Sequence, residues 1–266
     1  LCYDAAGQAT TKVAIAVNDP TSLRIDAIAE AFGARVFRAE VGEANVVNLA
    51  NQLRQQGWLV RILGEGSNGG NITHPAAVRD PLNTIASILK LLTMTGSSGQ
   101  PGLFGIWCQR RGISCPSQFG LAGIIATLPA WVTTSAYEDR AILKIRTMDH
   151  ALLKERYEAL FLEAWEKDKH DLAKRFGIMS WEELNYEGTI ERAGFGPGFR
   201  TGAARGGFRI LFRNSESTPV AMIWMRGSGT EPVFRVAAEV SGKDPQSELW
   251  LLEWHKALIA RADSAS

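Results

Sequence analysis

Residues 12–39 read KVAIAVNDPTSLRIDAIAEAFGARVFRA, and this stretch decides the fold of the first half of the chain. The apolar run over 12–17 is typical of a buried parallel strand, and residues 18–20 (Asn-Asp-Pro) are typical of the turn that follows one. Apolar residues then recur at helical spacing until Gly33, which predicts a helix. A second strand is expected over 34–39. Strand, helix and strand in this order imply a parallel sheet with a helical crossover.

The same alternation continues with a helix expected over 45–56 and a third strand over 58–63. Ligands bind such sheets beyond the carboxyl ends of the strands, so residues 64–71 (Gly-Glu-Gly-Ser-Asn-Gly-Gly-Asn) form the expected binding loop. Glu65 only accepts hydrogen bonds, whereas Ser67 both donates and accepts, and such a pair suits sugar hydroxyls. Two alternatives stay open: a flexible loop with Glu65 solvated, and a dinucleotide loop, although the latter's glycines should follow the first strand and open a helix.

A second loop lies in residues 225–235 (Met-Arg-Gly-Ser-Gly-Thr-Glu-Pro-Val-Phe-Arg), between apolar runs over 220–224 and 233–240 that predict two strands. Its side chains are rich in donors for an anion. Guanidinium groups offer paired N–H donors, hydroxyls add more, and glycines let backbone N–H groups approach an oxyanion. The pattern indicates a site for a dianionic phosphate. The alternative is a surface turn with incidental arginines.

Residues 226–232 (Arg-Gly-Ser-Gly-Thr-Glu-Pro), followed by Arg235 and Glu239, resemble the phosphate-binding signature of the last domain of the α-D-phosphohexomutases. That superfamily includes the phosphoglucomutases and phosphomannomutases. The one departure in this stretch is Gly227, where the family usually has Pro or Ala. Residues 64–67 (Gly-Glu-Gly-Ser) are similar to the sugar-binding loop of the family's third domain.

Two departures concern the first half of the chain. The family generally continues its sugar loop with Gly-His, where this chain has Asn68-Gly69-Gly70. Many members also place a Lys or Arg that reaches the ligand in the segment matching residues 41–45 (Val-Gly-Glu-Ala-Asn), and this chain has neither there.

The resemblance implies a fold of the α/β class. A three-layer α/β/α domain with a mixed, mainly parallel sheet is expected over 1–94. A linker of irregular structure is expected over 95–125. A smaller α+β domain with an antiparallel sheet, similar to the TATA-box-binding protein, is expected over 126–266. Residues 168–205 read as an insertion in it, either a lid or an interaction loop.

The resemblance also implies roles for site residues. The phosphate group that is not being transferred would be bound by Arg226, Ser228, Gly229, Thr230 and Arg235. Sugar hydroxyls would be held by Glu65 and Ser67.

The chemistry of the family lies in two motifs that this sequence lacks. Members transfer phosphate from a phosphoserine in the first domain, hold Mg²⁺ with an Asp-x-Asp-x-Asp-Arg loop in the second, and use a hexose bisphosphate as intermediate and activator. No such serine context or aspartate loop occurs between Leu1 and Ser266. Phosphoryl transfer chiefly requires that metal and an in-line nucleophile. The chain itself therefore supplies no catalytic residue and no metal ligand, and we expect it to be inert alone.

The chain begins with Leu1 rather than Met, so we expect the C-terminal half of a longer phosphohexomutase, an intramolecular phosphotransferase of the isomerase class. The parent would interconvert hexose 1-phosphate and hexose 6-phosphate in carbohydrate metabolism. Its partners would be the hexose phosphate and the missing N-terminal domains. The alternative is a non-catalytic sensor or scaffold that binds a phosphosugar.

Composition excludes several other classes of protein. The net charge of +1 argues against a nucleic-acid partner that binds a broad basic face, and no apolar run approaches membrane length. Three cysteines without a CxxC pair do not suggest a disulfide framework or a zinc site. A reducing cytoplasm is the expected location.

Overall fold

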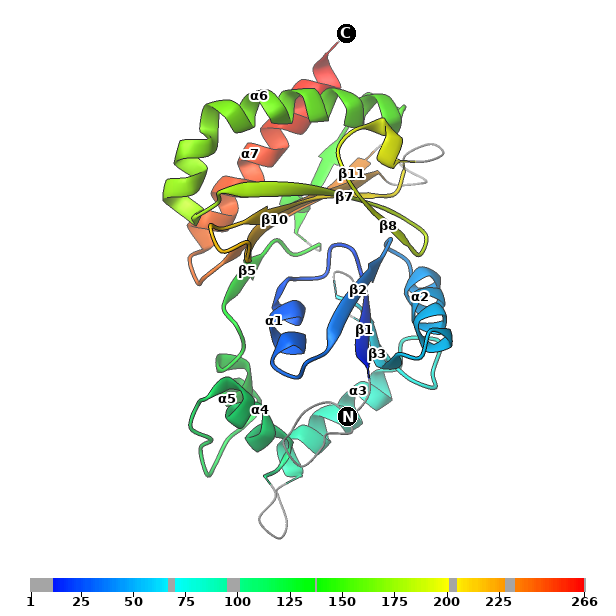
Figure 1. Ribbon diagram of the computed structural model, residues 1–266, viewed down its shortest axis with the longest axis vertical. Coiled ribbons are helices and arrows are strands. Elements are labelled where there is room, and N and C mark those ends of the chain that lie inside the picture. The colour runs from blue at the N-terminus through cyan, green and yellow to red at the C-terminus, as the bar shows by residue number, and fades with distance from the viewer. Residues whose placement is uncertain are drawn as a thin grey trace.

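The computed structural model describes residues 12–66, 70–94, 101–136, 138–200, 205–227 and 233–265. Figure 1 shows two domains, with the helices α6 and α7 on the far side of the second sheet from the first domain. The first domain consists of β1 (Val13–Asn18), α1 (Arg24–Glu30), β2 (Arg35–Ala39), α2 (Glu43–Gln55), β3 (Leu59–Glu65), β4 (Gly70–Thr73) and α3 (Pro81–Thr93).

The first sheet has the order β2-β1-β3-β4. β1 runs parallel to both β2 and β3, whereas β4 is antiparallel to β3, so the predicted mixed and mainly parallel sheet is confirmed. The helix α2 covers one face, because Val46 and Leu49 belong to the same buried cluster as Ala14 and Leu63 of the strands. Helices α1 and α3 flank the other face.

The expected binding loop over 64–71 is shorter in the structure. β3 continues through Glu65, and Glu65 pairs with Gly70 at the start of β4. The two ends of the stretch therefore form an antiparallel pair of strands, and residues 67–69 lie outside the described residues.

The expectation of irregular structure over 95–125 is wrong for much of its described part. It contains α4 (Leu103–Arg111) and α5 (Leu121–Ala126). Phe104 and Trp107 of α4 are buried together with residues from the ends of α1 and α3, so these helices pack on the first domain. Scattered glycines hid α4 from the sequence, although Gly112 ends it in a left-handed conformation with φ of 63°, a common helix stop.

The second domain consists of β5 (Trp131–Thr133), the 3-10 helix η1 (Asp139–Ala141), β6 (Ile142–Lys144), α6 (His150–Phe176), β7 (Ser180–Glu187), β8 (Ile190–Ala193), the 3-10 helix η2 (Pro197–Phe199), β9 (Gly207–Arg213), β10 (Pro219–Gly227), β11 (Val233–Ser241) and α7 (Pro245–Ser264). Its antiparallel strands have the order β5-β11-β10-β9-β7-β8, with β6 also beside β11. Among the described residues this sheet has seven strands against four in the first, so the second domain is not the smaller one.

Alternation along β10 decides what each face of the second sheet contacts. Ile223 and Met225 join the core beneath α6 and α7, with Tyr157, Phe161 and other aromatic residues. Met222 packs instead in a cluster with Leu23, which precedes α1. Trp224 and Arg226 share the face of Met222, so they too point toward the first domain.

Residues 168–205 were expected to be a lid or an interaction loop, and the structure corrects this. The segment begins inside α6 and then supplies β7 and β8, and β7 pairs with β9 from Ser180 to Tyr186. The sequence concealed β7 because polar residues occupy inward positions. Glu183 and Asn185 are both buried, and the amide of Asn185 donates to the carboxylate of Glu183 at 2.7 Å. In the described part of the chain, no helix has the length and apolar character needed to cross a lipid bilayer.

Candidate functional site

A cavity of about 520 Å³ lies between the two domains, and we call it the interdomain pocket. Its size is within the usual range for a small-molecule site. The first domain contributes the chain between β1 and α1 together with Val41 and Gly66. The second contributes residues 133–136 and the ends of β10 and β11 next to the predicted phosphate loop.

Two arginines on neighbouring strands give the interdomain pocket its charge. Arg226 on β10 and Arg235 on β11 are directly opposite each other in the antiparallel register, and both line the pocket. Like charges directly opposite each other on paired strands destabilise a sheet, and the carboxylate of Glu40, which pairs with Arg226, offsets part of that repulsion. An anion bound between the two guanidinium groups would remove that cost.

A third arginine of the pocket, Arg24, already donates its hydrogen bonds to backbone carbonyl groups. Arg24 donates from Nε to the carbonyl oxygen of Pro129 at 3.0 Å and from Nη2 to that of Trp131 at 2.6 Å. To the residues that the structure describes, Arg235 donates one long bond, from Nη1 to Ala136 O at 3.4 Å. Arg226 and Arg235 are thus the cations best placed to bind an anion.

Glu40, at the carboxyl end of β2, holds one edge of the Arg226 guanidinium. Nε and Nη2 of Arg226 donate to Oε1 of Glu40 at 3.3 and 3.2 Å. The other oxygen of Glu40 accepts from the backbone N–H of Gly188, and Glu40 N donates to Gly188 O, each at 2.9 Å. The turn between β7 and β8 therefore fixes the carboxylate that orients Arg226.

The remaining residues of the predicted phosphate site lie outside the described part of the chain. Ser228, Gly229 and Thr230 fall within 228–232, between β10 and β11, and their role stays a prediction. Ser67 of the predicted sugar site also falls outside it.

Glu65 is described, and it is buried, with 3% of its surface exposed. Its Oε1 accepts from the N–H of Gly42 at 2.7 Å, and its Oε2 lies 3.9 Å from Nη1 of Arg79. The carboxylate thus holds the chain that precedes α2, while its neighbour Gly66 lines the interdomain pocket. No contact of Glu65 in the structure tests the predicted role in holding sugar hydroxyls.

Glu239, the last residue of the family signature, ties the two domains together. It is fully buried on β11 and accepts from Leu23 N at 2.7 Å and from the hydroxyls of Ser22 and Thr133. Ser22 and Thr133 both line the interdomain pocket, so their hydroxyls already have a structural partner. The walls of the pocket are therefore held in place by this buried carboxylate.

A second buried carboxyl group, Asp19, lies beside the pocket. Its Oδ2 accepts from the indole N–H of Trp224, a pocket residue. Burial raises the pKa of Asp19 to about 7, against the opposing effects of the Trp224 hydrogen bond and the charges of Arg226 and Arg209. Arg226 is thus within the electrostatic reach of two carboxyl groups of the first domain, Asp19 and Glu40.

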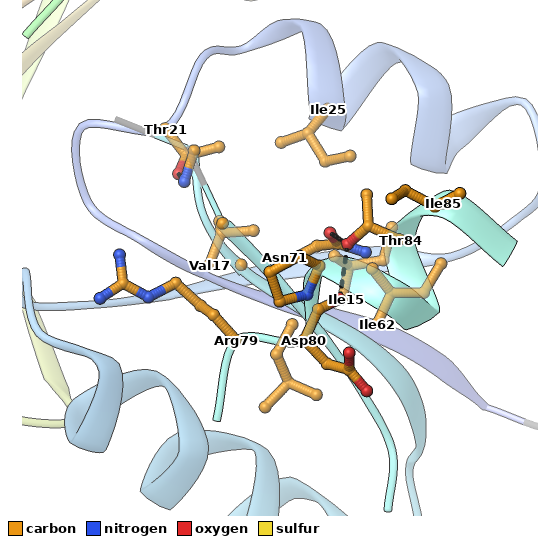
Figure 2. Close-up of a pocket in the computed structure, with 15 residues that line it drawn as sticks. Ile15, Val17, Thr21, Ile25, Ile62, Asn71, Arg79, Asp80, Thr84 and Ile85 are labelled. Atoms are coloured by element: carbon orange, nitrogen blue, oxygen red, sulfur yellow. Dashed lines mark hydrogen bonds between the residues drawn. The ribbon is translucent and has the colours of Figure 1, made fainter. Parts of the chain in front are cut away.

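A different cavity, of about 610 Å³, lies on the open face of the first sheet between α1 and α3. Figure 2 shows its isoleucine side chains together, with the guanidinium of Arg79 extending away from them. That guanidinium donates from Nε to Glu43 at 2.9 Å. Because its lining is mainly apolar and its arginine already has a carboxylate, this cleft is a weaker candidate for a phosphate site.

The family model described as phosphoglucomutase/phosphomannomutase, alpha/beta/alpha domain III, matches residues 1–101. The first domain is therefore similar to the third domain of that family. The match ends before the second domain, and no curated protein matches the chain.

Similarity to a phosphoglucomutase/phosphomannomutase domain raises the question of a metal. Among the residues that the structure describes, no group of three or more His, Cys, Asp or Glu side chains could hold a metal ion. These residues do not fit a magnesium site.

Sequence reasoning missed two residues beside the site, Asp19 and Glu40. Asp19 sits in the Asn-Asp-Pro turn and was read only as part of that turn. Glu40 follows β2, so the rule that ligands approach the carboxyl ends of parallel strands could have pointed to it.

Proposed function

We propose that this chain is the C-terminal half of a phosphohexomutase and that its interdomain pocket binds the phosphate group of a hexose phosphate. The observation that carries the proposal is the pair Arg226 and Arg235, opposite each other on two strands and lining one pocket. A dianion between two guanidinium groups accepts charge-assisted hydrogen bonds from both. Ser228, Gly229 and Thr230 would add hydroxyl and backbone donors.

The proposed orientation of the ligand follows from the two walls of the pocket. The phosphate lies at the second domain, against the arginines, and the sugar ring points to the first domain near Gly66. Glu65 and Ser67, on either side of Gly66 in the chain, would hold the sugar hydroxyls. The ligand would then contact both domains at once.

The chain provides recognition rather than chemistry in this proposal. Its arginines bind the phosphate that stays on the sugar. The missing N-terminal domains of a cytoplasmic parent would supply the phosphoserine that transfers the other phosphate, together with Mg²⁺. A hexose bisphosphate is the expected intermediate there. The chain alone should therefore bind hexose phosphate without turning it over.

Isothermal titration calorimetry with inorganic phosphate and with glucose 1-phosphate tests the proposal. We compare the wild type with Arg226→Ala and with a matched control, Arg261→Ala, whose exposed guanidinium on α7 lies 3.6 Å from Glu163 and away from the pocket. Losing a charge-assisted hydrogen bond should weaken binding by about 10- to 100-fold in Arg226→Ala. Arg261→Ala should bind like the wild type. Equal affinity in all three proteins, or no binding by the wild type, would refute the proposal.

A further inference from the structure

The imidazole ring of His150 contacts both strands that border the phosphate loop, which we define as residues 226–232. β10 ends at Gly227, and β11 pairs Phe234 with it. The ring of Phe234 meets His150 edge to face, with ring centroids 5.1 Å apart and planes at 86°. A Cβ atom added to Gly227 would lie 2.0 Å from Cε1 of His150 and 2.3 Å from its Nδ1. One ring thus occupies the space next to both stems of the loop, by which we mean the end of β10 at Gly227 and the start of β11 at Phe234.

His150 has little room to move away from these stems. It is the first residue of α6, a helix of 27 residues, and 5% of its surface is exposed. Asp149 caps the helix by accepting from the N–H groups of Ala151 and Leu152 at 2.9 and 3.1 Å. Because the helix packs along the core of the domain, the ring is held from behind by a rigid element.

The two residues that His150 contacts are the chain neighbours of the two pocket arginines. Gly227 follows Arg226, and Phe234 precedes Arg235. Side chains alternate along a strand, so Arg226 and Arg235 point to the pocket while Gly227 and Phe234 face the ring. Fixing the stems on one face of the sheet therefore sets the separation and direction of the guanidinium groups on the other.

We propose that His150 is a positioning residue for the pocket arginines Arg226 and Arg235, and that Gly227 is glycine because the imidazole takes the space of a Cβ. The inference rests on the proposed phosphate-binding function and extends it to a residue outside the loop. It also explains the departure from the Pro or Ala that the phosphohexomutases usually have there. His150 acts through the strands and does not contact the ligand.

The role of His150 depends on the shape of the ring rather than on its charge. Burial lowers the pKa of His150, and the charges of Lys154 and Arg205 lower it further against the opposing effect of Asp149. The ring is therefore neutral near pH 7. Phenylalanine, which has a flat ring of similar size, should take its place.

The test measures the affinity for inorganic phosphate in four variants and one control. His150→Ala removes the ring and should weaken binding by about tenfold, whereas His150→Phe should bind within about twofold of the wild type. Gly227→Ala forces a methyl group into the ring and should weaken binding by about tenfold or more. In the double variant His150→Ala/Gly227→Ala the methyl meets no ring, so the second change should add little. His170→Ala removes an exposed histidine of the same helix and should leave affinity unchanged.

Circular dichroism and the thermal midpoint of each variant test whether the fold is retained. Normal affinity in His150→Ala and Gly227→Ala, or additive losses in the double variant, would overturn the inference and leave the proposed function standing. Loss of binding in His150→Phe equal to that in His150→Ala would overturn the role of ring shape. Absence of binding by the wild type would instead refute the proposed function, and the inference with it.

Discussion

Arg226 and Arg235 impose a cost on the unliganded protein that a bound anion should remove. Replacing Arg235 by Gln ends the repulsion across the strands, so the free energy of unfolding without ligand should stay equal or rise by about 0.5 kcal/mol. Phosphate at about 100 times its dissociation constant should stabilise the wild type by about 2.7 kcal/mol and the variant far less. Urea unfolding with and without phosphate measures both effects.

The control for this experiment is Arg213→Gln, which removes an arginine that pairs with Glu182 away from the pocket. Because Arg213→Gln keeps both pocket arginines, it should gain as much stability from phosphate as the wild type, and any gain from exclusion of phosphate from protein surfaces is common to all three proteins. An Arg235→Gln variant that gains as much stability from phosphate as the control would contradict the assignment of the pocket.

Gly207, at the start of β9, shows how closely the two domains approach. A Cβ atom there would lie 1.6 Å from Oδ2 of Asp19. Gly207→Ala should therefore displace the Asp19 carboxyl from Trp224 and lower the free energy of unfolding by about 1–3 kcal/mol. Gly198→Ala is the matched control, because a Cβ there meets no atom within 4 Å. Equal stability of the two variants in urea would show that the domains separate more easily than the structure indicates.

At the residue scale, the sequence indicated donors better than it indicated their partners. Arg226 and Arg235 could be recognised because two guanidiniums flank a glycine-rich turn. Glu40 could not be paired with Arg226, since 186 residues separate them and only the packing of the domains joins them. The hydrogen bond from the backbone N–H of Gly42 to the carboxylate of Glu65 could not be predicted from the sequence for the same reason.

Helix α7 is tied to the rest of the second domain by a neutral, buried histidine. Nδ1 of His255 lies 2.8 Å from the hydroxyl of Tyr157 on α6, and Nε2 lies 3.2 Å from Trp224 O on β10. Burial lowers the pKa of His255 to about 3, from 6.5 for an unperturbed histidine. In the unfolded chain His255 is therefore protonated below about pH 6.5, whereas in the folded protein it stays neutral down to about pH 3.

This difference predicts how stability depends on pH. The contribution of His255 is fully present above pH 6.5 and is lost as the pH falls toward 3, by up to about 1.4 kcal/mol per pH unit. His255→Gln cannot take up that proton, so its stability should fall less steeply over this range. Urea unfolding of both proteins at several pH values measures the difference between their free energies of unfolding. The contributions of the carboxyl groups, which both proteins share, cancel in this difference. Parallel curves would show that His255 is not neutral in the folded protein.

At the element scale, periodic segments were predictable and mixed ones were not. The alternation of strand and helix over 12–63 was clear because apolar residues line one face of each helix. β7 was missed because its inward positions include Glu183 and Asn185, whose burial depends on each other and on Arg200, 3.5 Å from Glu183. A pattern of single residues does not reveal such a pairing.

At the scale of the molecule, a few buried polar groups join the domains. Glu239 bonds to residues on both sides, and Glu239→Ala should leave the donors of Leu23, Ser22 and Thr133 unpaired. The cost is about 1–3 kcal/mol for each donor that stays buried. We therefore expect the domains to uncouple, so that a single calorimetric unfolding transition becomes two. The control is Glu253→Ala, at an exposed residue that pairs with Lys256, and it should keep the single wild-type transition. A single transition in both variants would contradict the role of Glu239 in joining the domains.

In the proposed function both domains contribute to one phosphosugar site, and a crystal structure of the chain with glucose 1-phosphate would locate the ligand. We predict the phosphorus atom between the guanidinium groups of Arg226 and Arg235, with the sugar ring toward Gly66. A ligand in the apolar cleft between α1 and α3, or a phosphate that contacts neither arginine, would contradict the account.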